Sequence, residues 1–143
     1  MKISLIITTF NWPESLLLVL KSVRNQTLLP DEIIIADDGS GENTRNLISN
    51  FKKQFDLNII HSWQEDNGFR AARSRNKAIF MSSGDYIVMI DGDTVLHNNF
   101  IKDHLINIEN GCFIQGTRSL ISEKETREVL VKKDSNFSFF SSG

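Results

Sequence analysis

Short apolar runs alternate with helical patterns along most of the chain, and this alternation limits the possible folds more than any other feature. The most apolar runs span residues 3–7, 32–36 and 86–90, and a further run spans 57–63. A run that is apolar at every position is typical of a strand covered on both faces, as in a parallel sheet flanked by helices. The sequence therefore predicts an α/β fold with a mostly parallel sheet and helices on both faces.

The segments between these runs carry helix signals. Pro13 suits a first helical turn, and apolar residues follow it at helical spacing. Ser40 is a suitable N-cap for a second helix, and a third is expected over 67–82. A fourth helical pattern ends at Gly111, after which residues 112–114 are predicted to return to the sheet. The sequence predicts nothing regular beyond Arg118.

Composition excludes several classes of protein. A chain of 143 residues with 16 Lys and Arg against 18 Asp and Glu has no general attraction for nucleic acid. The one cysteine, Cys112, is expected to be a small buried hydrophobe. The apolar N-terminal run is too short for a signal peptide or a membrane span, which favours a cytoplasmic location. The sequence is compatible with peripheral attachment to the inner face of the plasma membrane and with assembly into a homo-oligomer.

Polar residues, most of them acidic, follow each of the first four predicted strands. In an open parallel sheet the ligand crevice lies beyond the carboxyl ends of the strands, so these residues are expected to meet there. Clustered carboxylates repel one another unless a divalent cation or hydrogen-bond donors neutralise them. For some of them, helix capping is an equally good interpretation. The clusters are Thr8-Thr9, Asp37-Asp38, Glu65-Asp66 and Asp91 with Asp93.

Two further features bear on the chemistry of this crevice. Asp91-Gly92-Asp93 ends a buried strand and offers two carboxylates to Mg²⁺ or Mn²⁺. The predicted helix after Asn67 carries four cations near its start, where free N–H groups also favour an anion such as a diphosphate. Arg70, Arg73 and Lys77 are expected to share one solvent-facing side of this helix. Arg75 points elsewhere and is expected to reach the crevice. His97 and His104 show no metal-ligand spacing and are expected at the surface.

Four motifs follow one another along the chain, namely Ile6–Asn11, Ile35–Ser40, Arg75–Ile79 and Ile90–Asp93. In this order they resemble the nucleotide-binding half of family 2 glycosyltransferases with the GT-A fold. The resemblance covers residues 2–118 and implies that 1–120 form a nucleotide-sugar-binding subdomain. Residues 121–143 would begin the acceptor region or form a C-terminal tail, so the fold is expected to be an incomplete domain. The strings 64–70 and 115–118 look like the bacterial galactosyltransferase-like and chondroitin-polymerase-like branch, which builds surface polysaccharides.

The resemblance also implies roles for individual residues in binding the nucleotide. Thr8 and Asp38 would hold the uridine, with Asp38 accepting a hydrogen bond from the base N–H. Asp66, Gly68 and Arg75 would line the same pocket.

The metal and the reaction are implied in the same way. Asp93 would bind Mn²⁺ or Mg²⁺, with Asp91 contacting the ribose or a metal-bound water. The reaction would be an inverting transfer from a UDP-sugar to a saccharide or lipopolysaccharide acceptor, with a carboxylate as general base. No residue after Asp93 can be assigned as that base.

Three alternatives were weighed against this interpretation. Asp91-Gly92-Asp93-Thr94-Val95 fits the first motif of haloacid-dehalogenase-type phosphatases, with Asp91 as nucleophile, but that motif belongs on the first core strand. A nucleotidyltransferase needs a Gly-rich basic loop after the first strand, which residues 8–12 do not provide. A non-catalytic module that binds a sugar nucleotide is the third alternative.

Overall fold

The computed structural model describes residues 1–134, and strands alternate with helices through most of them. This alternation confirms the predicted α/β class. The elements in chain order are β1 (Ile3–Thr9), α1 (Pro13–Arg24), β2 (Glu32–Asp37), α2 (Glu42–Phe55), β3 (Ile59–Trp63), α3 (Ala71–Met81), β4 (Tyr86–Asp91), α4 (Phe100–Asn107) and α5 (Glu123–Lys132).

The strands form one parallel sheet in the order β3-β2-β1-β4. Because all four run in the same direction, their carboxyl ends meet along one edge. Register places Thr9 beside Asp37 and Thr8 beside Asp91 at that edge. Polar residues far apart in the sequence are thus brought together by strand pairing alone.

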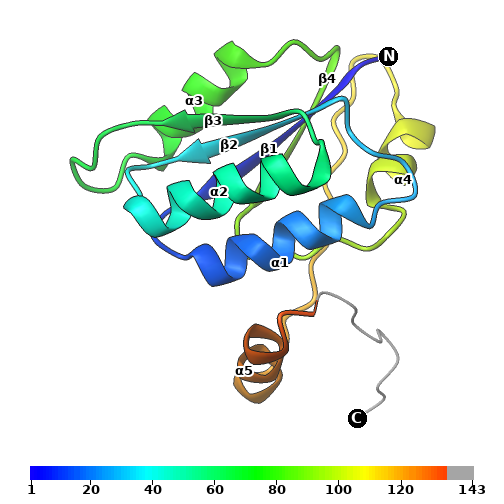
Figure 1. Ribbon diagram of the computed structural model, residues 1–143. Helices are drawn as coiled ribbons and strands as arrows, with labels where there is room; N and C mark the ends of the chain where they lie inside the picture. The colour runs from blue at the N-terminus through cyan, green and yellow to red at the C-terminus, as the bar shows by residue number, and fades with distance from the viewer. Residues whose placement is uncertain (135–143) are drawn as a thin grey trace.

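Helices cover both faces of the sheet, as predicted (Figure 1). On one face α1 and α2 enclose the larger core, which includes Leu5, Ile7 and Ile35. On the other face α3 packs through Ala78 on a smaller cluster that includes Ile6. Residues of β1 enter both cores, which explains why four of the five residues from 3 to 7 are apolar. Each fully buried Leu or Ile stabilises the fold by about 1.5–3 kcal/mol.

The amino-terminal edge of the sheet carries a buried carboxylate. Glu32, at the start of β2, is 3% exposed and accepts hydrogen bonds from the Ser4 hydroxyl at 2.6 Å and from the Ser83 amide at 2.6 Å. Its second oxygen accepts from the Ser83 hydroxyl at 2.8 Å, and Lys2 lies 3.9 Å away. The bond from Ser4, followed by those from Ser83, lowers the pKa of Glu32 to about 2.

Three predictions after β4 were wrong. Residues 112–114 form no strand and pair with none of the four strands of the sheet. They follow a turn at Gly111, whose φ is +79°. Cys112 is exposed, since the segment that was expected to bury it does not join the sheet. His104 is buried instead of lying at the surface: it packs on Phe100 and bonds the Tyr86 hydroxyl. Burial lowers the pKa of His104.

Two helix starts also differ from the prediction. Ser40 does not cap α2, which begins after Gly41 without a side-chain cap. The Ser40 hydroxyl instead accepts a hydrogen bond from the Asn11 amide at 2.9 Å. Helix α5 was not predicted, although Ser122 and Glu125 form a capping box at its start. This helix buries no residue and extends away from the sheet (Figure 1). The apolar segment at 135–143 lies outside the described residues.

None of the helices within residues 1–134 is both long and apolar enough to cross a bilayer.

Candidate functional site

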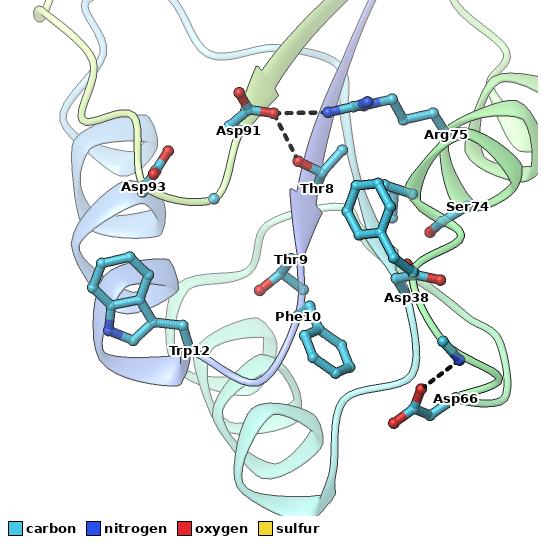
Figure 2. Close-up of a pocket in the computed structure, with 15 residues that line it drawn as sticks. Thr8, Thr9, Phe10, Trp12, Asp38, Asp66, Ser74, Arg75, Asp91 and Asp93 are labelled. Atoms are coloured by element: carbon cyan, nitrogen blue, oxygen red, sulfur yellow. Dashed lines mark hydrogen bonds and ion pairs between the residues drawn. The ribbon is translucent and has the colours of Figure 1, made fainter.

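A cavity of about 450 Å³ opens at the carboxyl edge of the sheet, between the ends of β1, β2 and β4 and the start of α3. Figure 2 shows its lining. Three aromatic side chains at its rim, Phe10, Trp12 and Phe69, had no predicted role. The lining also includes every residue that the sequence singled out for binding: Thr8, Asp38, Asp66, Gly68, Arg75, Asp91 and Asp93.

At one side of the cavity Asp91 is held by three groups from different elements. Thr8, its register partner on β1, donates to its Oδ1 at 3.0 Å, and Arg75 on α3 donates to the same oxygen at 3.0 Å. A guanidinium nitrogen of Arg118 lies 3.6 Å from its Oδ2. Arg75 therefore reaches the cavity as predicted, and its contact with Asp91 is drawn in Figure 2.

Arg118 is a site residue to which the sequence analysis gave no role. It belongs to the string 115–118, which was noted only as a family likeness. Its side chain is 68% exposed and approaches Asp91 from a segment without regular structure. The string itself was the signal that could have drawn attention to this residue.

Asp93 differs from Asp91 in having no partner within the described residues 1–134. The chain turns at Gly92, where a Cβ would stand 2.3 Å from the Thr8 carbonyl oxygen, so glycine is required for this close approach. Ser15 fixes the turn by donating to the Gly92 carbonyl at 2.9 Å. Among residues 1–134, no hydrogen bond or ion pair ties down the exposed Asp93 carboxylate, which lies at the cavity (Figure 2).

The carboxylates suit a divalent cation only in partnership with a ligand. Within the described part of the chain, no three His, Cys, Asp or Glu side chains gather into a complete metal site. Mg²⁺, however, is commonly bound by one or two carboxylates together with substrate phosphates. Asp93, with Asp91 beside it, fits that pattern in its oxygen chemistry.

At the other side of the cavity Asp38 is nearly buried, with 5% of its surface exposed. Gln64 donates to its Oδ1 at 2.5 Å, and the Arg70 backbone amide donates to its Oδ2 at 2.7 Å. Asp38 is therefore fixed by two donors while its remaining lone pairs are available for a further donor. Gln64 is a second residue to which the sequence analysis gave no role.

The loop before α3 completes this side of the cavity. Gly68 adopts a φ of +81°, and its amide donates to Asp66 Oδ1 at 3.1 Å. Asp66 packs against Gly39, where a Cβ would lie 2.6 Å from the Asp66 Cα. The loops after β2 and β3 are thus in direct contact, and Asp66 is held near Asp38 (Figure 2).

Asp37 does not share the cavity with Asp38, so one part of the predicted acidic crevice was wrong. It is fully buried and accepts from the Ser40 amide at 2.8 Å and from His61 at 2.7 Å. Burial raises the pKa of Asp37, but the bonds from His61 and Ser40 outweigh it, and the net shift is downward. Asp37 closes the loop after β2 through the Gly39 and Ser40 amides. It does not cap α2, which begins after Gly41 without a side-chain cap, so the capping interpretation was also wrong.

Comparison with known proteins gives one family and several relatives. The model of the family described as "Glycosyl transferase family 2" matches residues 4–142. The hyaluronan synthase of Pasteurella multocida is 37% identical over 122 residues, which is 83% of this chain and 12% of that protein.

Solved structures show the same fold. The complex of S. aureus TarS 1-349 with UDP matches with a TM-score of 0.68 and 23% identity, over 81% of this chain and 38% of that one. Glucosyl-3-phosphoglycerate synthase from Mycobacterium tuberculosis, in complex with Mn²⁺, UDP and glucosyl-3-phosphoglycerate, matches with a TM-score of 0.57 and 21% identity, over 74% and 40%. The fold is therefore the GT-A fold that the sequence predicted, and the chain spans less than half of each of these relatives.

Proposed function

The chain belongs to glycosyltransferase family 2, and on that premise we propose that it is the donor-binding part of an inverting, metal-dependent glycosyltransferase that uses a UDP-sugar. The observation that carries the proposal is the cavity at the carboxyl edge of the sheet. Residues from three strand ends, one loop and α3 all line it, and these are the residues that the family resemblance selects. The acceptor would be a saccharide or glycolipid, in keeping with the hyaluronan synthase relative.

The nucleotide would lie across the cavity with its base at Asp38 and its phosphates toward Asp91 and Asp93. Asp38 offers acceptor lone pairs to the base N–H, and the rim aromatics offer flat surfaces to ring systems. Arg75 and Arg118 supply positive charge close to Asp91, where a diphosphate would enter. The UDP complex of TarS, which has the same fold, supports this choice of ligand.

Asp93, assisted by Asp91, would hold Mn²⁺ or Mg²⁺ jointly with the diphosphate. The bound cation would neutralise negative charge on the leaving diphosphate. Support comes from the Asp93 carboxylate, which has no partner in the described part of the chain, and from the Mn²⁺ and UDP complex of the mycobacterial synthase, which has the same fold.

In the transfer itself, the acceptor oxygen would form a bond to the anomeric carbon as the bond from that carbon to the diphosphate oxygen breaks. The acceptor hydroxyl would lose its proton to a carboxylate base, to which we assign no residue of this chain. Arg75 and Arg118 would remain beside the departing phosphate and stabilise the developing charge.

Thermal unfolding with and without ligands tests donor binding. UDP should raise the melting temperature when Mn²⁺ or Mg²⁺ is present and leave it unchanged with a chelator, because the cation joins Asp93 to the diphosphate. Asp93→Asn should abolish the shift. Asp103→Asn, which changes an exposed carboxylate on α4 away from the cavity, should retain it. A shift that survives both the chelator and Asp93→Asn would refute the proposed metal role.

Transfer activity separates an enzyme from a module that only binds a sugar nucleotide. UDP release from a UDP-sugar panel, in the presence of saccharide acceptors, should depend on Asp93 if this chain takes part in catalysis. Family membership removes the phosphatase alternative, whose motif would open the fold and not follow its fourth strand.

A further inference from the structure

Gln64 is a nearly buried amide that lies behind the carboxylate proposed to read the base. It follows β3 directly and is 9% exposed. Its Nε2 donates to Asp38 Oδ1 at 2.5 Å and to the Arg70 carbonyl at 3.3 Å. One side chain therefore links the loop after β2, the end of β3 and the start of α3.

The orientation of this amide is forced by Asp38. Its Oε1 is buried and has no hydrogen-bond partner among residues 1–134, an arrangement that costs free energy. Rotating the amide by half a turn would place that oxygen against the Asp38 carboxylate, where two acceptors would repel each other. The unpaired oxygen is thus the consequence of keeping the N–H directed at Asp38.

Three other polar groups are likewise buried without a partner in the described part of the chain, namely the hydroxyls of Ser62 and Ser74 and the Arg70 Nε. Ser62 lies on β3, two residues before Gln64, and Ser74 lies in the first turn of α3. Of these side chains, only that of Gln64 bonds Asp38.

Asp38 is consequently held at both oxygens, by Gln64 on one and by the Arg70 amide at 2.7 Å on the other. An ionised carboxylate only accepts hydrogen bonds, and each of its oxygens can accept more than one. Fixed in this way, Asp38 presents acceptor lone pairs in a defined direction and cannot turn to present anything else. Such a group favours a base edge that carries a donor.

We propose that Gln64 is a positioning residue that sets the base selectivity of the cavity by fixing Asp38. The inference rests on the proposed function, namely that the cavity binds UDP. Uracil carries an N–H at position 3, from which Asp38 can accept a hydrogen bond, whereas cytosine has a lone pair at that position. A fixed carboxylate therefore accepts uracil and repels cytosine, while a carboxylate free to rotate would discriminate less.

Calorimetric titration of UDP and CDP in the presence of Mn²⁺ tests this role. The unmodified chain should bind UDP at least about a hundredfold more tightly than CDP, because a buried acceptor left facing another acceptor is costly. Gln64→Met, which keeps the size of the side chain and removes the donor, should weaken UDP binding about tenfold. It should leave CDP binding nearly unchanged, so that the UDP to CDP ratio falls about tenfold.

Ser62→Ala is the matched control. It changes another buried polar side chain, two residues earlier in the sequence, that makes no hydrogen bond to Asp38, so the UDP to CDP ratio should stay at its original value. The melting temperature of each variant shows whether it is folded. A purely structural contribution of Gln64 would weaken both nucleotides equally.

Two further variants sharpen the test, and the first of them keeps it decisive if Gln64→Met does not fold. Gln64→Glu preserves the shape and places an acceptor where the donor stood, and it should reduce the ratio at least as much. In an Asp38→Asn background, Gln64→Met should have no further effect on the ratio, since both act through one group. Non-additive effects of Asp38→Asn and Gln64→Met on the UDP to CDP ratio support the proposal. Additive effects of the two substitutions overturn it.

The outcomes separate this inference from the function on which it rests. Absence of UDP binding by the unmodified chain would overturn both. Tight UDP binding with a ratio that neither Gln64 variant changes would overturn only the role of Gln64.

Discussion

The two edges of the sheet both carry acidic side chains, but the partners of these side chains differ. At the amino-terminal edge Glu32 is buried and receives hydrogen bonds from Ser4 and Ser83 through both of its oxygens. At the carboxyl edge Asp93 has no partner within residues 1–134, and Asp91 is held by groups that remain partly exposed. The cavity at the carboxyl edge is lined by both Asp91 and Asp93.

This difference shows how one residue type serves two purposes. A carboxylate whose lone pairs are satisfied by the protein itself contributes to stability and has no capacity left for a ligand. A carboxylate that keeps free lone pairs over a cavity contributes little to stability and can bind a cation or an N–H donor. Removing a side chain at the amino-terminal edge should therefore lower stability, whereas removing one at the carboxyl edge should mainly weaken ligand binding.

The largest expected effect is on stability at the amino-terminal edge. Glu32→Ala should lower the free energy of unfolding by about 3 kcal/mol, because buried donors lose a charged partner. Urea denaturation measures the change. Asp91→Ala, at the carboxyl edge, should lower it by no more than about 1 kcal/mol, since its ion pairs are partly exposed. Equal losses of unfolding free energy in the two variants would contradict the difference between the two edges.

Glu32 should also contribute to the pH dependence of stability. The pKa of Glu32 is lowered from 4.5 to about 2 in the folded chain, so its stabilising effect is complete above pH 4.5 and is lost as the pH falls toward 2. Between pH 4.5 and 3 the loss should amount to about 2 kcal/mol. Subtracting the pH profile of Glu32→Gln from that of the unmodified chain isolates this term; identical profiles would show that Glu32 does not titrate in this way.

At the carboxyl edge, Arg75 should affect binding more than stability. Arg75→Ala should weaken UDP about tenfold, because it removes a cation placed beside the expected diphosphate and releases Asp91. Uridine, which lacks phosphate, should bind equally to both forms. Arg73→Ala removes an exposed cation of the same helix that does not line the cavity and should leave UDP binding unchanged. Titration calorimetry compares the three proteins.

Arg118 should have the smallest effect of this series. Its side chain is 68% exposed and its guanidinium lies 3.6 Å from Asp91, so Arg118→Ala should weaken UDP binding only about threefold. Arg118→Lys should recover part of the affinity because it keeps the charge. An effect of Arg118→Ala on uridine as large as that on UDP would show that the residue does not act on the phosphates.

The sequence predicted the parts of the molecule that depend on local pattern. Residues 3–7 of β1 and 33–36 of β2 are almost all apolar because both faces of these strands are covered, and that pattern is visible without a structure. The gathering of Asp38, Asp91 and Asp93 followed from strand order, since parallel strands place their carboxyl ends together.

Features that depend on distant contacts could not be predicted in this way. The roles of Gln64 and Arg118 arise from side chains that meet Asp38 and Asp91 only after folding. The run at 112–114 is short enough that its apolar character does not specify a strand partner, and Cys112 is exposed for the same reason. Helix α5 is a different case, because the capping box of Ser122 and Glu125 is a local signal that was overlooked.

The central claim is that a divalent cation joins the carboxylate at residue 93 to the diphosphate of a nucleotide whose base contacts Asp38. A crystal structure of the chain with UDP and Mn²⁺, with the anomalous signal of manganese recorded, tests it directly. The account predicts an anomalous peak at the Asp93 carboxylate and the uracil ring beside Asp38. Manganese or nucleotide bound elsewhere, with Asp38 and Asp93 contacting neither, would contradict it.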